Sequence, residues 1–290
     1  MNETGDTLCY LNGDWLPLAE ARISPLDRGF LFGDGAYEVI PVYSRRPFRV
    51  GEHLARLQST LDGIRLANPL ATDEWAACVV RIVAAAPFED QSVYIQVTRG
   101  TDDKRDHPFP PGVPPTVFIF TAPLVTAPEP VRAAGVAAVT VPDERWARCD
   151  LKVVALLANV LARQYAVDRG CAESIFVRDG VMIEGTASSI FVVRDGVLLA
   201  PQKDRRMLPG ITYDVILELA DQHGLPYVVR DIAATELAAA DEIWMASSTR
   251  EVLAITTLDG RPVGAGVPGP MARQMYDWYQ DFKNEVMRRG

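Results

Sequence analysis

The run Arg-Cys-Asp-Leu-Lys-Val-Val at residues 148–154 is the most informative stretch of this chain, because it places Lys152 at a junction. Residues 135–141 before it are predicted to be extended, and a helical pattern begins at Val153. The lysine side chain is therefore expected to project from the rim of a scaffold. Two later runs accompany it: Ile183-Glu184-Gly185-Thr186 in a β-rich stretch, and Leu208-Pro209-Gly210-Ile211-Thr212 at the start of an amphipathic helix.

Together the three runs meet the three demands that pyridoxal phosphate makes of a protein. The coenzyme needs an amine that holds its aldehyde as a Schiff base, a carboxylate that keeps its ring nitrogen protonated, and an anion site for its phosphate. Lys152 supplies the amine and Glu184 the carboxylate. The first backbone N–H groups of a helix that opens at Gly210-Ile211-Thr212 are free to bind the phosphate. The sequence therefore predicts pyridoxal 5'-phosphate as the cofactor.

On these runs the chain resembles the class IV pyridoxal-phosphate aminotransferases, which have the fold called type IV, and it is most similar to the D-amino-acid aminotransferases among them. The resemblance covers nearly the whole chain and keeps the family's order. It implies an α+β enzyme with a small N-terminal α/β domain and a larger C-terminal α/β domain that has a β-barrel-like core. The other matching runs are Asp27-Arg28-Gly29-Phe30 with Phe32-Gly33-Asp34-Gly35-Ala36-Tyr37-Glu38-Val39, Glu52-His53-Leu54-Ala55-Arg56-Leu57, Gln96-Val97-Thr98-Arg99-Gly100 and Ala246-Ser247-Ser248-Thr249.

The resemblance implies a catalytic role for Lys152, which would form the Schiff base and then move a proton between substrate Cα and cofactor C4′. Taken alone, Lys152 is one of several cationic positions, and the ordinary interpretation of such a lysine is a solvated surface charge. Glu184 would stabilise the protonated ring nitrogen, because an opposite charge at contact range favours the charged form. Without the resemblance, Glu184 reads as the end of a hairpin that begins at Asp179-Gly180.

The phosphate site is expected at the start of the helix that follows Gly210. Thr212 offers a hydroxyl where the helix dipole is positive, although a simple N-terminal cap is the alternative. The resemblance assigns Arg56 to the phosphate as well, and a guanidinium suits a phosphate by its bidentate geometry. Otherwise Arg56 is one more exposed arginine. The remaining cofactor-binding residues that the resemblance implies are Ser188, Leu208, Gly210, Ile211, Ser247 and Ser248.

Substrate recognition is expected from Tyr37 and from an Arg-x-His pair, Arg105 and His107, in a long polar loop. In D-amino-acid aminotransferases such a pair binds the substrate α-carboxylate and reaches across from the partner subunit. The resemblance therefore implies a homodimer with active sites near the subunit interface. The plain alternatives are a core aromatic for Tyr37 and a solvated charge for Arg105.

Composition excludes several other classes of function. The 290 residues carry a net charge of −9, with a sequence pI near 4.9 and no basic stripe, so no nucleic-acid partner is expected. No run suits a signal peptide or a membrane span, which predicts a cytoplasmic protein without a membrane partner. The 4 cysteines show no CxxC spacing and are expected to be buried thiols. With only 3 histidines, none paired with a cysteine at ligand spacing, no metal site is expected.

Two domains are expected along the chain, at residues 1–121 and 132–290, with a linker at 122–131. The linker assignment follows from three prolines, which disfavour regular helix and suit an extended segment. The predicted helices lie near 52–66, 73–86, 153–169 and 211–223 and from Pro270 onward; the predicted strands lie near 8–10, 37–43, 93–99, 116–121, 135–141, 226–229, 242–246 and 252–256, with four more between 173 and 200.

Three positions depart from the family's pattern. Pro41 interrupts an alternating strand and predicts an edge or a bulge. Ala187 lacks a hydroxyl that is common in D-amino-acid aminotransferases, and Arg250 is bulkier than its counterparts, which leaves the side-chain range of the substrate open.

The expected function is transamination between a D-amino acid such as D-alanine and a 2-oxo acid such as 2-oxoglutarate. The alternatives of the same fold are a branched-chain L-amino-acid aminotransferase, an (R)-selective amine transaminase and an aminodeoxychorismate lyase. An inactive binding protein of this fold is a further alternative, which the presence of Lys152 and Glu184 disfavours.

Overall fold

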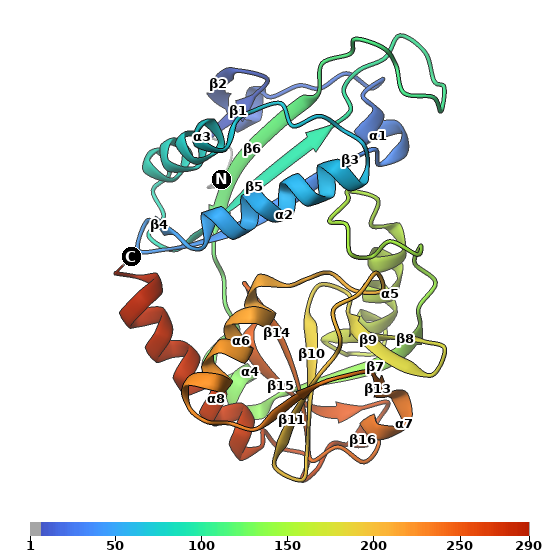
Figure 1. Cartoon of the computed structure of the whole chain (residues 1–290). Helices are drawn as coiled ribbons and strands as arrows, with labels where there is room; N and C mark the ends of the chain where they lie inside the picture. The colour runs from blue at the N-terminus through green and yellow to red at the C-terminus, as the bar shows by residue number, and fades with distance from the viewer. Residues whose placement is uncertain (1–6, 290) are drawn as a thin grey trace. The chain divides into compact units, whose positions relative to one another are not determined.

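The computed structural model describes residues 7–289 and divides into two compact units (Figure 1). Unit 1 takes the described residues as far as Val125, the short segment Leu151–Leu156 and the described residues from Glu285 onward. Unit 2 takes Thr126–Asp150 and Leu157–Asn284. Lys152 thus belongs to unit 1, although the chain on either side of its segment belongs to unit 2.

Unit 1 contains a 6-stranded antiparallel sheet in the order β2-β1-β6-β5-β3-β4. Its strands are β1 (Leu8–Leu11), β2 (Asp14–Pro17), β3 (Gly35–Tyr43), β4 (Arg46–Pro47), β5 (Gln91–Thr98) and β6 (Thr116–Pro123). Its helices are α1 (Arg28–Phe32), α2 (Val50–Gly63) and α3 (Thr72–Ala85).

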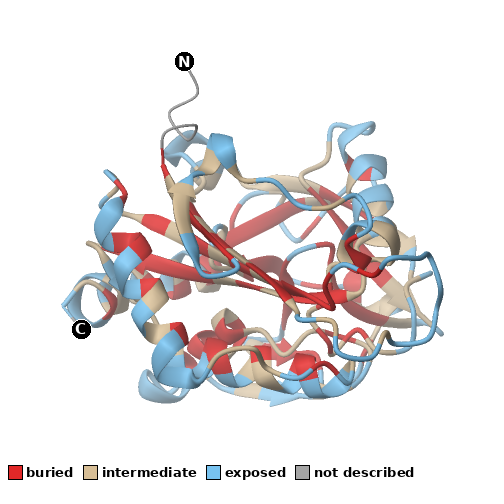
Figure 2. Ribbon diagram, turned by 90° about the horizontal axis from the view of Figure 1, so that it is seen from above, coloured by how far each residue is buried: buried red, intermediate tan, exposed pale blue. Residues whose placement is uncertain are grey.

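Strand alternation creates the core of unit 1. Every second residue of β3 and β5, among them Ile40 and Ile95, is buried against apolar residues of α2 and α3 such as Leu57 and Val79. The strands of both units lie in the interior, while the helices expose their outer faces (Figure 2). The residues between those of the core, including Tyr37, point to the opposite face of the sheet.

Unit 2 contains a 10-stranded mixed sheet whose main path runs β12-β11-β10-β14-β15-β7-β8-β9-β13, with β16 paired to β15. The sheet curls around an apolar cluster that includes Ile190, Met245 and Ile255, which confirms the expected barrel-like core (Figure 1). Its strands are β7 (Val136–Pro142), β8 (Glu173–Arg178), β9 (Val181–Gly185), β10 (Ser189–Arg194), β11 (Val197–Ala200), β12 (Tyr227–Val229), β13 (Ile232–Ala233), β14 (Glu242–Ser247), β15 (Glu251–Leu258) and β16 (Arg261–Pro262). Its α-helices are α4 (Glu129–Ala134), α5 (Leu157–Val167), α6 (Ile211–Gln222), α7 (Ala234–Leu237) and α8 (Pro270–Phe282).

Two predicted elements differ from the structure. The helix expected from Val153 begins only at Leu157, because Val153 bridges to Ala36 and the Val154 N–H bonds to the Gly35 carbonyl at 3.0 Å. The expected linker is not extended throughout, since helix α4 begins at Glu129, before the predicted end of the linker, and Pro130 occupies its first turn. A proline is tolerated there because the first helical N–H groups have no intrahelical partner.

Pro41 lies where the sequence predicts it, near the edge of a sheet. Strand β3 is bordered on one side by β5 along its whole paired length and on the other only by the short β4. The ring of Pro41 therefore removes no donor from a central ladder.

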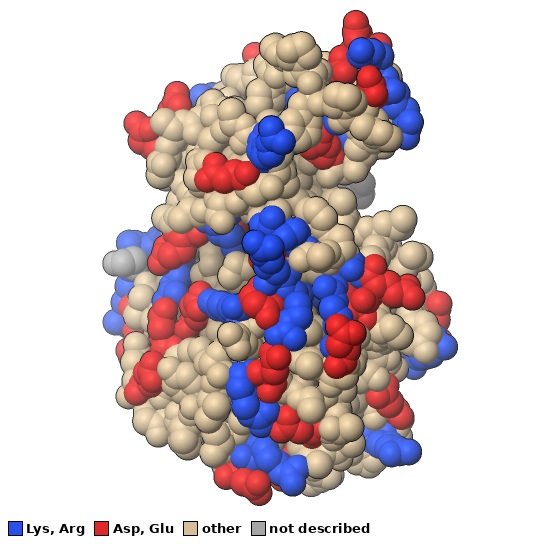
Figure 3. Space-filling model, turned by 45° about the vertical axis from the view of Figure 1, so that its right-hand side comes forward, with Lys and Arg blue, Asp and Glu red and all other residues tan. Residues whose placement is uncertain are grey.

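Over residues 7–289, no helix combines the length and apolar character needed to cross a bilayer. Within the same range, no group of three or more His, Cys, Asp or Glu side chains is placed to hold a metal ion. Acidic and basic side chains are interspersed on the face shown in Figure 3.

Candidate active site

Backbone hydrogen bonds hold Lys152 in unit 1, and its side chain lies beside an aromatic ring. Its N–H donates to Thr60 Oγ1 at 3.2 Å, and its carbonyl accepts the Tyr37 N–H at 3.0 Å. Its neighbours Leu151 and Val153 are buried, so the segment is anchored on both sides. The Nζ atom lies 4.0 Å from the centre of the Tyr37 ring. Two predicted site residues, Lys152 and Tyr37, are thus brought together.

Tyr37 is part of a half-buried aromatic face and not of the core. Its ring stacks on Tyr94 with a centroid separation of 5.7 Å, and Tyr94 in turn contacts Phe120 at 5.2 Å. Because alternate residues of a strand point to opposite faces, the neighbouring Glu38 points the other way, toward α2. The alternative of a fully buried core aromatic is therefore wrong for Tyr37.

Glu38 is a fully buried carboxylate that holds two side chains of α2. Arg56 donates to it through Nε at 2.7 Å and Nη2 at 2.8 Å, and His53 Nδ1 lies 2.8 Å away. Burial disfavours the ionised form, but the hydrogen bonds from Arg56 and His53 outweigh it and lower the pKa of Glu38 to about 2. Burial also lowers the pKa of His53, so this imidazole is neutral and donates from Nδ1. The guanidinium of Arg56 is consequently fixed by Glu38.

Replacing Glu38 by glutamine is expected to lower the free energy of unfolding by about 3 to 5 kcal/mol at neutral pH, because it removes the buried charge to which the largely buried Arg56 donates twice. Since folding lowers the pKa of Glu38 from 4.5 to about 2, this contribution is present above pH 4.5 and is lost as pH falls through 2. Urea unfolding at neutral and at acidic pH measures the difference between the two proteins.

Glu89→Gln is the matched control, because it removes an exposed carboxylate from an ion pair. Glu89 Oε1 lies 3.7 Å from Arg45 Nη1. This substitution is expected to cost less than about 1 kcal/mol. If the Glu38→Gln protein were as stable as the parent at neutral pH, the Glu38–Arg56 ion pair would not contribute to stability.

The loop that carries Arg105 and His107 is anchored by a buried arginine. Arg28 donates to the backbone carbonyls of Asp106 at 2.6 Å and His107 at 3.0 Å. The guanidinium of Arg105 lies 5.0 Å from the centre of the Phe32 ring, and the His107 ring lies 5.5 Å from it. The two residues predicted to bind a carboxylate are therefore neighbours on one aromatic side chain.

Glu184 lies buried at the end of β9 in unit 2 and has two partners. Arg145 Nη1 donates to its Oε1 at 2.5 Å, and the Leu208 N–H lies 3.3 Å from each carboxylate oxygen. Burial raises the pKa of Glu184 to about 7, against the charge and hydrogen bond of Arg145. The contact joins two predicted cofactor residues, Glu184 and Leu208. The alternative of an exposed hairpin end is wrong for this residue.

Thr212 and Ser247, two of the predicted phosphate residues, lie near the start of α6, whereas Arg56 belongs to unit 1. Gly210 is the N-cap residue and supplies no side-chain cap, so the first N–H groups of α6 stay available. Thr212 is the second helical residue and not the cap. A Cβ added to Gly210 would lie 3.0 Å from Ser189 Oγ, and Ser189 pairs with Ala246 directly before Ser247. The helix start and the end of β14 therefore meet beside the first residue of β10.

The side chain of Ser188 has a structural partner. Its hydroxyl donates to Glu173 at 2.9 Å, and the same buried carboxylate accepts the Thr186 N–H at 3.1 Å. A Cβ on Gly185 would lie 2.3 Å from Ser188 Oγ, so only glycine fits this turn. Glu173 thus shapes the turn that follows Glu184.

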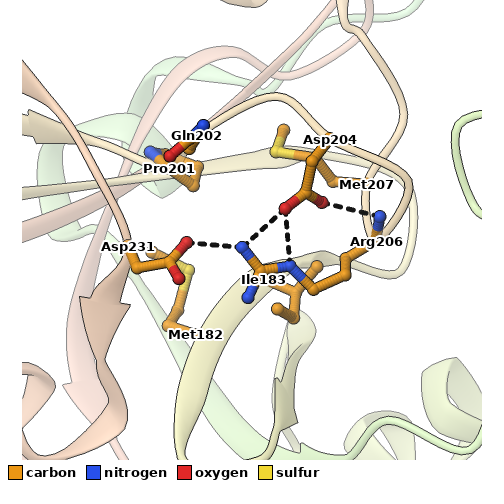
Figure 4. A pocket seen from close by; sticks show the side chains of 8 residues that line it. All are labelled: Met182, Ile183, Pro201, Gln202, Asp204, Arg206, Met207 and Asp231. Carbon is orange, nitrogen blue, oxygen red and sulfur yellow. Dashed lines mark hydrogen bonds and ion pairs between the residues drawn. The ribbon is translucent and has the colours of Figure 1, made fainter.

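A small pocket is lined in part by Ile183 and Met207, the chain neighbours of Glu184 and Leu208 (Figure 4). Arg206 bridges it, with ion pairs to Asp204 at 2.6 Å and to Asp231 at 2.5 Å. None of the predicted site residues lines this pocket; the lining residues are Met182, Ile183, Pro201, Gln202, Asp204, Arg206, Met207 and Asp231. The ion pairs fix the loop and so help to place the Leu208 N–H.

Sequence reasoning missed the polar residues that support the predicted ones. Glu38, His53, Arg145 and Glu173 each contact a predicted residue or a direct partner of one. Glu38 and His53 lie within quoted runs, and for Glu38 a charge at a buried strand position is the available signal. For Arg145 and Glu173 the sequence carries no such signal.

A family model described as amino-transferase class IV matches residues 35–258, and the chain belongs to this family of aminotransferases. It is 35% identical over 264 residues to the D-alanine aminotransferase of Bacillus licheniformis, covering 91% of this chain and 93% of the relative. It is 36% identical over 274 residues to the D-alanine aminotransferase of Staphylococcus aureus strain COL, covering 94% of this chain and 96% of the relative.

Solved structures of the same fold come from branched-chain aminotransferases. The branched-chain amino acid aminotransferase from T.th., solved with pyridoxamine 5'-phosphate, has a TM-score of 0.88 and 26% identity, over 95% of this chain and 93% of that chain. The Thermoproteus uzoniensis branched-chain aminotransferase with norvaline has the same TM-score of 0.88 and 26% identity, over 98% and 97% of the two chains. The expected type IV fold is confirmed.

As a class IV aminotransferase the chain is a pyridoxal-phosphate-dependent transaminase, as the sequence predicts. The described residues of unit 2 fit this cofactor on two counts. The start of α6 is uncapped and lies beside hydroxyl side chains. The carboxylate oxygen Oε2 of the buried Glu184 accepts, among residues 7–289, from the Leu208 N–H at 3.3 Å. This oxygen can therefore accept a further hydrogen bond.

Proposed function

We propose that the chain exchanges an amino group between a D-amino acid, with D-alanine as the leading candidate, and a 2-oxo acid such as 2-oxoglutarate. The observation that carries the proposal is the Arg105–His107 pair beside Phe32, on a loop that Arg28 anchors. The curated relatives at 35% and 36% identity, which are D-alanine aminotransferases, support the same choice.

Pyridoxal phosphate, when bound, supplies an electron sink for the reacting Cα. Lys152 would hold its aldehyde covalently, and the Nζ atom would take the proton from substrate Cα and deliver it in the next step. Glu184 would bind the ring nitrogen in its protonated form. The phosphate would be bound by the N-terminal N–H groups of α6 and by Thr212, Ser247, Ser248 and Arg56.

Arg105 and His107 would bind the α-carboxylate of the substrate. A guanidinium matches a carboxylate in charge and in hydrogen-bond geometry. A carboxylate bound in this way would fix which substituent of Cα faces Lys152, and therefore which enantiomer reacts. Tyr37, in contact with the Lys152 ammonium, would border the substrate pocket.

Replacing Arg105 by alanine tests this assignment. Removing a hydrogen bond to a charged group costs about 1.5 to 3 kcal/mol. At about 1.4 kcal/mol per tenfold, KM for D-alanine is expected to rise by roughly one to two powers of ten. Steady-state kinetics measures it, and a simple (R)-amine, if it is a substrate, should be nearly unaffected.

Lys104→Ala is the matched control, because Lys104 is an exposed cation of the same loop, 3.9 Å from Asp106. It should leave KM unchanged. An Arg105→Ala enzyme that treats D-alanine as the parent does would remove the basis for the D-amino-acid assignment.

A homodimer is part of the proposal, and one face of α5 supports it. Leu157, Val160 and Leu161 are 71%, 59% and 62% exposed in the single chain. Their spacing of three and four residues puts them, with Tyr165, on one side of the helix. An apolar stripe of this kind marks an interaction surface.

Leu161→Glu is expected to shift the protein from dimer to monomer, since it places a charge in an apolar contact. Sedimentation velocity measures the change. Val80→Glu is the control, because Val80 is an exposed apolar residue, 61% exposed, on α3. A dimer unaffected by Leu161→Glu would place the subunit contact elsewhere.

Branched-chain L-amino-acid transamination is the second candidate. The solved branched-chain enzymes that match at TM-scores of 0.88 favour it. L-Leucine as amino donor distinguishes the two candidates directly, because the proposed enzyme should prefer D-alanine.

A further inference from the structure

Arg145 is the side chain that pairs with the carboxylate of Glu184, and its own position is fixed from several directions. Asp143 accepts from its Nε at 2.8 Å and from its Nη2 at 2.9 Å, in a two-pronged ion pair. The Arg206 carbonyl accepts from Nη2 at 3.2 Å, and the guanidinium carbon lies 4.1 Å from the centre of the Phe176 ring. Nη1 is left to meet Glu184, at 2.5 Å.

The contact fixes Glu184 as well. Arg145 occupies Oε1, and the Leu208 N–H lies 3.3 Å from both oxygens. The loop with Leu208 is itself held by Arg206 and its two acidic partners (Figure 4). The carboxylate therefore has one strongly bonded oxygen and one oxygen open to a further donor.

Burial and charge act in opposite directions on the protonation of Glu184. Burial favours the neutral acid, whereas a guanidinium in contact favours the carboxylate. Asp143 balances both Arg145 and Arg178, since Arg178 Nη2 lies 2.9 Å from Asp143 Oδ2. The two arginines thus share Asp143, and Arg145 is the one of them that also pairs with Glu184.

We propose that Arg145 is a positioning residue that favours the ionised form of Glu184 and holds its Oε1, so that Oε2 is left to bind the ring nitrogen of pyridoxal phosphate. The proposal rests on the proposed function of Glu184. A proton shared between a carboxylate and a ring nitrogen goes to the nitrogen when a neighbouring cation stabilises the carboxylate. Arg145 thus controls the strength of the electron sink without touching the substrate.

The test is ¹⁵N NMR of protein reconstituted with pyridoxal 5'-phosphate labelled at the ring nitrogen, because the shift reports whether this nitrogen carries a proton. In the wild type it should be protonated at neutral pH. In Arg145→Met the midpoint of its titration should fall by roughly 1 to 3 pH units, the usual effect of an opposite charge in contact. Arg178→Gln, the matched control, should leave the midpoint unchanged.

The outcomes separate this inference from the proposed function. A wild type that binds no pyridoxal phosphate would defeat the proposed function. A wild type with an unprotonated ring nitrogen, an Arg145→Met midpoint equal to the parent's, or equal shifts in Arg145→Met and Arg178→Gln would overturn the role of Arg145 alone.

Arg145→Lys carries the test if Arg145→Met fails to fold or to bind the cofactor. It keeps the charge but cannot make the two-pronged pair with Asp143 and also reach Glu184 with a fixed fork. Its midpoint should fall below that of the parent, and an unchanged midpoint would count against the inference.

Discussion

Replacing Lys152 by alanine is expected to abolish transamination and to leave unit 1 folded. The hydrogen bonds that hold this residue come from its backbone, to Thr60 and from Tyr37, and its side chain contacts the Tyr37 ring. The lost function is covalent attachment and proton transfer, and proton transfer alone contributes roughly two to four powers of ten in rate. Turnover of D-alanine, with circular dichroism as a check of folding, measures the effect.

Borohydride reduction of the wild type with bound cofactor, followed by peptide mapping, should find the label on Lys152. Lys203→Ala is the control, because Lys203 is a partly exposed cation that pairs with Asp214. If Lys152→Ala kept near-parental turnover without added amine, another lysine would have to carry the chemistry.

Replacing Glu184 by glutamine is expected to slow the half-reaction by roughly two to four powers of ten. Breaking a buried charge pair costs about 3 to 5 kcal/mol, and about 1.4 kcal/mol corresponds to a factor of ten. The amide has nearly the same shape but cannot stabilise a protonated ring nitrogen. Cofactor binding should suffer less than rate, and stopped-flow absorbance of the bound cofactor measures both.

The same substitution has a consequence for stability that does not depend on activity. In the cofactor-free protein the pKa of Glu184 is raised from 4.5 to about 7, so its contribution is present below pH 4.5 and is lost as pH rises through 7. Glu184→Gln should remove this pH dependence.

Glu242→Gln is the control for both readouts, because Glu242 is a buried carboxylate that accepts the Met271 and Ala272 N–H groups at the start of α8. It should lower stability and leave the half-reaction rate unchanged. Equal half-reaction rates for Glu184→Gln and the parent would contradict the proposal that Glu184 stabilises the protonated ring nitrogen.

The local structure around the predicted cofactor residues could be read from the sequence where neighbouring residues alone determine it. Glycine and proline mark the turn before α6, and apolar spacing marks the helix itself, so the uncapped helix start could be read from the sequence. The same holds for Glu184, which closes a strand that follows an Asp-Gly turn.

The supporting residues were not predictable, because their partners are distant in the sequence. Arg145 and Glu184 lie 39 residues apart, and Glu38 and Arg56 lie 18 apart. The packing of strands, helices and loops against one another brings such residues together, and the periodicity of the sequence does not report it. The late start of α5 has the same origin, since residues next to Lys152 bond to β3 instead of continuing a helix.

The central claim is that this chain transfers the amino group of a D-amino acid, and the half-reaction tests it most directly. D-Alanine and L-alanine are added separately to the protein with bound pyridoxal phosphate, without a 2-oxo acid, and the absorbance of the bound cofactor is followed. D-Alanine should convert the cofactor and L-alanine should leave it nearly unchanged, with L-leucine slower than D-alanine. Faster conversion by L-leucine than by D-alanine would contradict the claim and put branched-chain transamination in its place.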